Sequence, residues 1–297
     1  VAGSTPPSTH FAGVAWNSEG WRGLPPVSRH PFFARQRRMM LERCGHVNPV
    51  SLDDALLRDG YSALAQVLDH RTAEEVVEEL PVSTGFVVSG AEGIPGLFAD
   101  RHLMEGDPHR VLEGLVIAGH AARTNFGIIR INGAARLTRE RMARANAKAQ
   151  AAGLIGERIL GSEFSFHVEI RQEARGPSLD EAPLSSIAAL AALPPLVAEG
   201  DGGRAGPGGS PTTLCGVSGP VDRAGIVEVD RGVTLREVLS SIAGGPRDRG
   251  QLTRALVVGA SGVPLSAESL DAPVQSLAAF SAGTGGLIAI PDDPTGS

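Results

Sequence analysis

The stretch DPHRVLEGLVIAGHAARTNFGIIRIN, residues 107–132, decides the fold. Asp107 followed by Pro108 predicts a helix start, because aspartate accepts hydrogen bonds from free N–H groups and proline fits the first helical position. Apolar residues at helical spacing continue this helix to Ala122. The apolar run Phe126–Asn132 then predicts a buried strand. Together they form one helix–strand unit.

The same alternation extends in both directions from this unit. Gly85–Ser89 predicts an earlier strand, Thr138–Ala152 a later helix, and the alternating apolar residues between Phe164 and Ile170 a third strand. Strands separated by helices of this length are typical of βαβ units with a parallel sheet. We therefore expect an α/β fold with a Rossmann-like βαβ domain over residues 81–198.

The first 80 residues predict an arm and short helices. Residues 1–30 are rich in Pro, Gly, Ser and Thr and carry Trp16 and Trp21, which suggests docking onto this chain or a partner. The arginine-rich segment His30–Gly45 predicts a helix with a solvated basic face, and a contact with acidic groups is the alternative. Thr72 and Glu75 form a capping box that begins a later helix.

The pattern changes after residue 198. Residues 199–210 have the composition of a linker. Beyond it, Thr212–Val217 and Gly225–Asp230 predict a hairpin, a capping box at Thr234 begins a helix, and further strands follow. We expect residues 211–297 to form a small α+β domain of the β-grasp (ubiquitin-like) type.

Composition excludes several classes of function. The 297 residues are 42% hydrophobic and 20% charged, with a net charge of −6, so we expect a folded protein without a nucleic-acid partner. No apolar run is long enough to span a membrane. The two cysteines, Cys44 and Cys215, indicate a reducing, cytoplasmic setting. They also exclude a self-contained iron–sulfur cluster, which normally needs four protein ligands.

Several stretches together resemble the NADH-oxidising FMN flavoprotein subunit of respiratory complex I, also found in NAD-linked formate dehydrogenases and hydrogenases. The strongest match is EGIPGLFADR at residues 92–101, and the order of matches holds over most of the chain. The other matching stretches are His30–Gln36, Arg43–Gly45, Gly60–Leu64, Glu105–His109, Ala152–Gly156, Ile159–Ser162, Gly225–Val229 and Asp271–Pro273.

The departures from that family suggest lost cofactor contacts. The family's glycine-rich loop, which holds the flavin phosphate on backbone N–H groups, has no counterpart in the short passage from Pro81 to Gly85. Two acids of the family's next motif are replaced by Ala91 and Ile94, which accept no hydrogen bonds from their side chains, while Glu92 is retained.

Four residues are the candidate remnants of a flavin or nucleotide site: Ser89, Glu92, Asp180 and Glu181. Their alternative roles are those of an ordinary turn serine and of surface carboxylates. The aromatic expected before the later acidic pair is replaced by Gly176. We expect no catalytic residue and no metal site, and the family's four-cysteine cluster domain is not expected within these residues.

Three hypotheses for function follow. The favoured one is a cofactor-free accessory subunit of a cytoplasmic multi-subunit redox complex, bound to iron–sulfur and catalytic subunits. The alternative is an FMN-dependent, NADH-oxidising electron-input subunit, in which FMN and NAD bind through a rearranged pocket. A third is a ligand-binding module that uses the β-grasp domain. Whether the chain is an enzyme is therefore left open between them.

Overall fold

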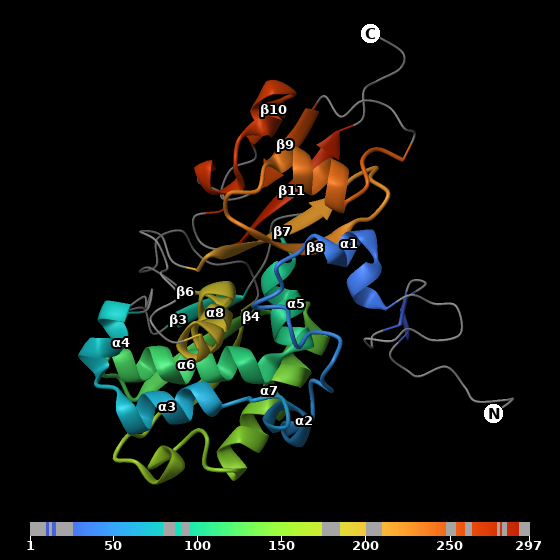
Figure 1. The fold of residues 1–297 in the computed structure, drawn as a ribbon. Helices are drawn as coiled ribbons and strands as arrows, with labels where there is room; N and C mark the ends of the chain where they lie inside the picture. The colour runs from blue at the N-terminus through green and yellow to red at the C-terminus, as the bar shows by residue number, and fades with distance from the viewer. Residues whose placement is uncertain are drawn as a thin grey trace, which may run out of the picture.

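The structure is a computed structural model. It describes residues 10–11, 14–15, 26–79, 87–90, 96–173, 185–199, 210–247, 254–258, 263–277, 280 and 284–290. The fold is a mixed α/β arrangement of two larger sheets with helices. The five-stranded sheet lies above the helices of the N-terminal half in Figure 1.

A four-stranded parallel sheet has the order β5-β4-β3-β6. Its strands are β3 (Val87–Gly90), β4 (Phe126–Asn132), β5 (His167–Glu173) and β6 (Ser185–Ser186). The predicted strand at residues 126–132 is confirmed at its full length, and parallel pairing follows the predicted βαβ pattern. Alternate β4 residues such as Ile129 and Ile131 are fully buried under the helices.

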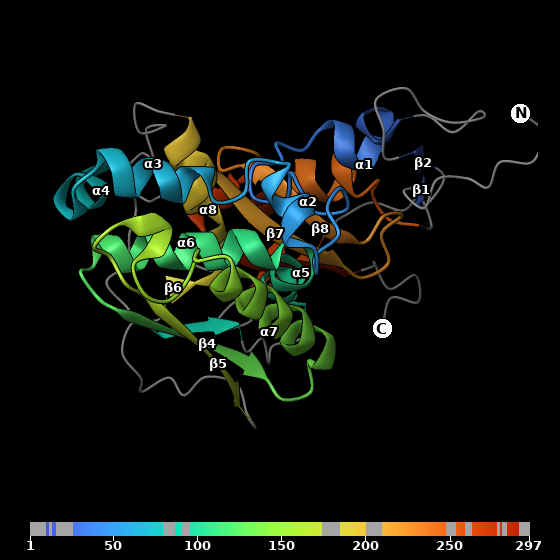
Figure 2. The ribbon, with the colours of Figure 1, turned by 90° about the horizontal axis from the view of Figure 1, so that it is seen from below.

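The helices stack in layers on one face of this sheet (Figure 2). Those nearest the sheet are α5 (Ala99–Gly106), α6 (Pro108–Ala121) and α7 (Arg136–Ala151). Farther out lie α2 (Leu52–Leu56), α3 (Ser62–His70) and α4 (Ala73–Glu79). The helix α8 (Ile187–Ala198) begins at β6 and rises past α6 to the outer layer.

The starts of two helices confirm the sequence signals. Asp107 accepts a hydrogen bond from Arg110 N at 3.1 Å and so caps α6. Thr72 and Glu75 form the predicted reciprocal box at α4, with Thr72 N donating to the carboxylate at 2.7 Å. These caps satisfy N–H groups that the first helical turn leaves without partners.

Helix α8 crosses α6 at close range through a glycine. Pro194 has no N–H to bond the Leu190 carbonyl, which lies against Gly114 of α6. A Cβ at Gly114 would collide with that carbonyl. The pair of prolines within α8 is therefore accommodated by a glycine on the neighbouring helix.

The second sheet has five strands in the order β10-β9-β11-β7-β8. They are β7 (Thr212–Ser218), β8 (Gly225–Asp230), β9 (Arg254–Val258), β10 (Val263–Ser266) and β11 (Thr284–Ile290). The predicted hairpin is confirmed, since β7 and β8 pair antiparallel, and β11 pairs parallel to β7. The capping box of Thr234 with Glu237 precedes the helical turn η3 (Glu237–Ile242).

Shorter elements complete the described chain. They are β1 (His10–Phe11), β2 (Val14–Ala15), η1 (Val27–Arg29), α1 (Pro31–Ala34), η2 (Ile159–Gly161), η4 (Glu268–Asp271) and η5 (Val274–Ser276). The helix expected over His30–Gly45 is wrong beyond Ala34, because the chain there runs as an irregular segment between the two sheets. We call residues 26–47 the strap.

The strap joins two hydrophobic cores. Phe32 packs into the core of the five-stranded sheet, whereas Met40 and Leu41 pack into the core under the helices. Strand β7 is shared in the same way, with Leu214 in the helical core and Cys215 in the other. The domain division expected at residues 80 and 81 remains a prediction, and the expected linker lies almost wholly outside the described residues.

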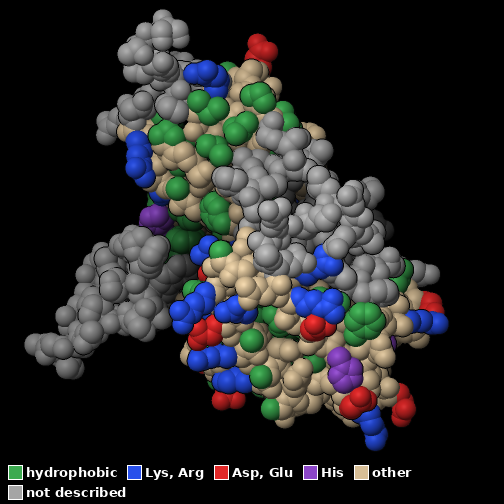
Figure 3. Space-filling model, turned by 180° about the vertical axis from the view of Figure 1, so that it is seen from behind, with side chains coloured by type: hydrophobic (Ala, Val, Ile, Leu, Met, Phe, Trp, Pro, Cys, Tyr) green, Lys and Arg blue, Asp and Glu red, His purple; other side chains and the backbone are tan. Residues whose placement is uncertain are grey.

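Basic and acidic side chains are interspersed on the face seen in Figure 3. Among the described residues, no helix is long and apolar enough to cross a bilayer.

Candidate functional site

The carboxyl edge of the parallel sheet is a topological switch point. From β3 the chain passes to β4 and then β5 on one side, while β6 lies on the other side of β3. In open parallel sheets, ligands bind outside the carboxyl ends of the strands at the point where the strand order reverses. The region just outside the carboxyl ends of β3 and β6 is therefore the candidate binding site, which we call the crevice.

Small and polar residues stand at this crevice. Strand β3 ends at Gly90, and β6 consists of Ser185 and Ser186. The Ser186 hydroxyl accepts a hydrogen bond from Ala189 N at 3.0 Å and caps α8. The positive end of the α8 dipole thus lies beside the end of β3, a position that favours a negatively charged group.

The four predicted site residues are only partly described. Ser89 lies in β3, in register with Arg130 of β4 and Ser186 of β6, next to the carboxyl end of the strand. Glu92, Asp180 and Glu181 lie outside the described residues. Their contact with a cofactor remains a prediction, as do the losses proposed at residues 81–85, 91 and 94.

The chain segment that leads from β3 to α5 packs against the second sheet. Gly96 has a positive φ of 91°, and its carbonyl oxygen lies against Gly216 of β7, where an added Cβ would stand 2.8 Å away. Phe98 packs at the same place, just before α5. The absence of a side chain at Gly216 therefore sets how closely the strand β7 approaches the segment leading from β3 to α5.

A buried ionic cluster lies at the start of α6. Arg43 from the strap donates to Asp107 through Nε at 2.7 Å and Nη2 at 3.2 Å. Arg110 donates to the same carboxylate through Nε at 3.1 Å and to the Met39 carbonyl at 3.1 Å. The side chains of Arg43, Asp107 and Arg110 are all at most 6% exposed. One carboxylate therefore serves two buried guanidinium groups.

Next to this cluster, three further titratable groups are buried. The Tyr61 hydroxyl lies 2.9 Å from His109 Nδ1, and Glu113 accepts a hydrogen bond from Leu64 N at 3.2 Å. Burial lowers the pKa of His109 to about 4 and raises the pKa of both Glu113 and Tyr61. These groups join α3 to α6 and hold His109 as a neutral ring near neutral pH.

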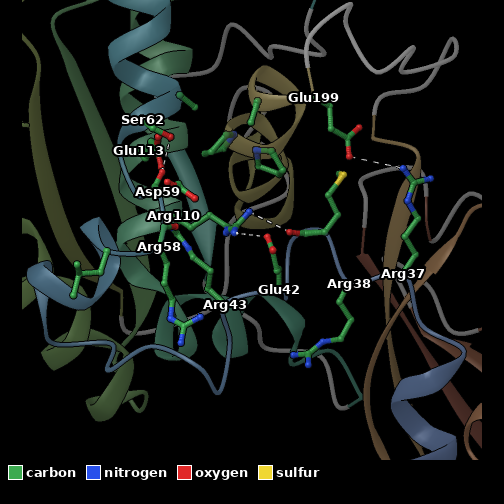
Figure 4. A pocket seen from close by; sticks show the side chains of 16 residues that line it. Arg37, Arg38, Glu42, Arg43, Arg58, Asp59, Ser62, Arg110, Glu113 and Glu199 are labelled. Atoms are coloured by element: carbon green, nitrogen blue, oxygen red, sulfur yellow. Dashed lines mark hydrogen bonds and ion pairs between the residues drawn. The ribbon is translucent and has the colours of Figure 1, made fainter. Parts of the chain in front are cut away.

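A cavity of about 640 Å³ opens over this cluster (Figure 4). Its lining includes five arginines: Arg37, Arg38, Arg43, Arg58 and Arg110. We call it the arginine cavity. Sequence reasoning noted the arginine-rich strap but did not predict a cavity. The signal was the density of arginine between residues 35 and 43, and its partners come from distant helices.

Neither cysteine is a candidate nucleophile. Burial raises the pKa of the Cys44 thiol to about 12 and also raises the pKa of Cys215. Both are buried and free. The described residues contain no group of His, Cys, Asp and Glu side chains arranged to hold a metal ion.

The parallel sheet, its switch point and the layered helices define the class of protein: a mixed α/β protein whose candidate ligand site lies at the carboxyl edge of the sheet. Residues 70–175, which include β3, β4 and β5, match the Nuo51 FMN-binding domain of the Complex1_51K family. The chain is a relative of the flavoprotein subunit of complex I, in agreement with the resemblance inferred from its sequence.

Curated relatives support this relationship. The chain is 28% identical to the NADP-reducing hydrogenase subunit HndC of Solidesulfovibrio fructosivorans, over 87% of this chain and 66% of that protein. It is also 28% identical to a subunit of the NADH-quinone oxidoreductase of Rhizobium meliloti (strain 1021), over 78% of this chain and 70% of the relative. The chain thus spans about two thirds of the length of these relatives.

A solved structure shares the fold. A chain of an NAD+-reducing NiFe hydrogenase in its H2-reduced state aligns with a TM-score of 0.54 and 19% identity. The alignment covers 88% of this chain and 52% of that one.

The expectation that this chain holds no cofactor is wrong. The match to an FMN-binding domain spans β3, β4 and β5, of which β3 borders the crevice, and indicates FMN binding. That expectation relied on the missing glycine-rich loop and on the replacements at Ala91, Ile94 and Gly176, whereas a flavin is also held by the strand ends and helix terminus of the surrounding sheet.

Proposed function

We propose that this chain is an FMN-dependent, NADH-linked electron-input subunit of a multi-subunit redox complex. The observation that carries the proposal is the match of residues 70–175 to an FMN-binding domain. The sheet topology supports it, because the switch point lies at the carboxyl ends of β3 and β6, where β3 ends at the small residue Gly90. When bound, FMN supplies two-electron acceptance from a nicotinamide and one-electron release to an iron–sulfur partner.

The chain's own residues would bind and orient the cofactor in this proposal. The N–H groups at the start of α8 stabilise an anionic phosphate, and Ser89 offers a hydroxyl beside the end of β3. Glu92, Asp180 and Glu181 would contact the flavin or the nucleotide. The packing of Gly216 against Gly96 keeps the segment after β3 close to the second sheet.

Two structural assignments belong to the same proposal. The order β8-β7-β11-β9-β10, with β7 parallel to the last strand, supports a β-grasp assignment for the region from residue 211 onward. The relatives are named as subunits, which supports partners that are other redox subunits, the iron–sulfur subunits among them. Cytoplasmic localisation remains an inference from the two unpaired cysteines.

The test is the visible spectrum of the full chain purified with its natural partners. We expect a flavin band in near one-to-one amount with the chain, bleached by NADH. Gly90→Leu should reduce the flavin content about tenfold or more, because its side chain fills the crevice. Phe126→Leu, at the amino end of the same sheet, is the matched control and should retain flavin. A wild-type complex with intact partners that releases no flavin on denaturation would refute the proposal.

A further inference from the structure

The strand β5 forms an open edge of the parallel sheet. The sheet has the order β5-β4-β3-β6, and among the described residues β5 pairs only with β4, over seven residues. In Figure 2, β5 lies at the margin of the sheet, beyond β4. An edge strand presents a row of unpaired N–H and C=O groups to which another extended chain can bond.

The other outer strands of the two larger sheets are short or covered. On β8, Glu228 O accepts a hydrogen bond from Arg37 N of the strap at 3.1 Å, and Glu228 N donates to Gln36 Oε1 at 3.0 Å. Strand β10 has four residues and includes Pro264, which has no N–H, and β6 has two residues. Strand β5 has seven residues without glycine or proline. Among the described strands it is therefore the one long edge without such protection.

The backbone groups that point into this edge can be assigned from the register. His167 N donates to the Asn125 carbonyl at 2.9 Å, so the backbone of His167 faces β4. Successive residues of a strand point their N–H and C=O groups to alternate sides. The groups of Ile170 and Gln172 therefore point away from β4, and no described residue bonds to them.

A hollow of about 440 Å³ lies beside the open edge, and its lining comes from α7 and β5: Arg136, Arg139, Glu140, Ala143 and Ile170. Glu140 is already paired with Arg144 at 3.2 Å. Arg139 bonds to the neutral side chain of Gln172, and Arg136 forms no ion pair with a described residue. The hollow therefore combines an apolar surface with two guanidinium groups that have no carboxylate partner among the described residues.

We propose that the open edge of β5 binds an extended acidic segment of another subunit of the redox complex. The segment adds to the parallel sheet as a further strand and bonds to the outward backbone groups of Ile170 and Gln172. It places an acidic side chain against Arg136 and Arg139. This inference rests on the proposed function, which supplies the partner subunits.

The charge of the hollow distinguishes this partner from a second copy of the chain. Two copies paired through β5 would each bring Arg136 and Arg139 to the shared edge, and like charges that face each other across a sheet are destabilising. An acidic segment pairs with the same guanidinium groups instead. In this mode of recognition the main-chain hydrogen bonds supply affinity, and the side-chain hollow supplies selectivity.

The first test compares Gln172→Pro with Gln172→Ala in the complex purified with its natural partners. Both variants lose the side-chain contact to Arg139, but only proline removes the outward N–H, and it leaves the bonds between β4 and β5 in place. We expect the proline variant to raise the dissociation constant for the partner subunits about tenfold or more relative to the alanine variant. Size-exclusion chromatography over a dilution series measures it.

The second test addresses the charge of the hollow. Arg136→Gln should weaken partner binding about threefold, with a smaller difference at high salt. Arg58→Gln is the matched control, because Arg58 is likewise exposed and forms no ion pair with a described residue. It should bind the partner subunits as the wild type does.

Photo-cross-linking identifies the occupant, with p-benzoylphenylalanine in place of Gln172 in the complex. We expect a cross-link to an acidic segment of another subunit. A cross-link to a second copy, to this chain itself or to no subunit would overturn the inference, as would equal dissociation constants for the proline and alanine variants. Flavin released on denaturation should be the same in the wild type and in Gln172→Pro, so failure here is distinct from failure of the FMN proposal.

Discussion

The two hydrophobic cores differ in what they bury. The core under the helices adjoins buried ionisable side chains, among them Arg43, Asp107, His109, Arg110 and Glu113. The core of the five-stranded sheet is built from apolar side chains such as Val217, Val227 and Leu239. Glu228, on β8, is buried and bonds both to the strap and to Thr212 of β7.

This difference indicates that buried charges determine the arrangement of the helical half, and not that of the five-stranded sheet. Buried charges cost several kcal/mol each unless they are paired, so their arrangement holds the strap and the helices in one geometry. An apolar core tolerates rearrangement more easily, provided its volume is kept. We therefore expect the helical half to respond to charge changes and pH, and the five-stranded sheet to respond mainly to changes in volume.

The largest expected effect comes from Asp107→Ala. It leaves Arg43 and Arg110 buried without their shared carboxylate and removes the cap of α6. We expect a loss of about 4 kcal/mol in the free energy of unfolding, measured by urea denaturation. Asp271→Ala is the control from the other half, because Asp271 is exposed in its pair with Arg236 and its loss should change the free energy of unfolding far less. Equal losses in the two variants would contradict the comparison.

The next largest effect on stability concerns the contact between Glu228 of the five-stranded sheet and the strap, which we call the joint between the two halves. Glu228 accepts hydrogen bonds from Met40 N and Leu41 N, each at 2.9 Å, and from the Thr212 hydroxyl at 2.7 Å. Glu228→Ala leaves three buried donors without an acceptor and should cost about 3 kcal/mol.

Limited proteolysis of the strap in Glu228→Ala, alongside urea denaturation, measures whether the joint opens first. Glu169→Ala on the exposed side of β5 is the matched control and should leave both measurements near the wild-type values. An unchanged cleavage rate in Glu228→Ala would show that the strap is held by packing alone.

The smallest effect is a pH dependence from His109. The unfolded imidazole binds a proton near its ordinary pKa of 6.5, while the buried folded ring does so only near about 4. The unfolded state therefore binds more protons between these values, and stability falls as the pH decreases through this window. His109 should account for about 2 kcal/mol of the loss between about pH 7 and about pH 5.

His109→Phe should remove that part of the pH dependence. The measurement is the difference in unfolding free energy between wild type and variant at each pH, which cancels the other titrating groups. A difference that stays constant with pH would mean that His109 takes up no extra proton on unfolding.

Local signals in the sequence predicted much of the fold. The strand Phe126–Asn132, the capped start of α6, the hairpin of β7 with β8 and both capping boxes depend on neighbouring residues, and all are confirmed. The site was predicted less well. Ser89 lies near the carboxyl edge, but the absence of a cofactor was inferred from a missing loop and a few replaced residues and is overturned by the FMN-binding match.

Other elements could not be predicted from local patterns. Helix α8 contains Pro194 and Pro195, which normally end a helix, and it persists here through packing against Gly114. The segment His30–Gly45 was predicted as a helix with a solvated basic face. The N–H groups of Met40 and Leu41 bond instead to the carboxylate of Glu228, which is distant in the sequence.

The sequence by itself determined the βαβ order, the helix starts and the relationship to the complex I flavoprotein subunit, because each rests on residues that are close together or matched in order. Only the tertiary structure decided the shared strand β7, the buried cluster around Asp107 and the arginine cavity. Those features join side chains separated by tens of residues or more, and their energies depend on the burial that folding creates.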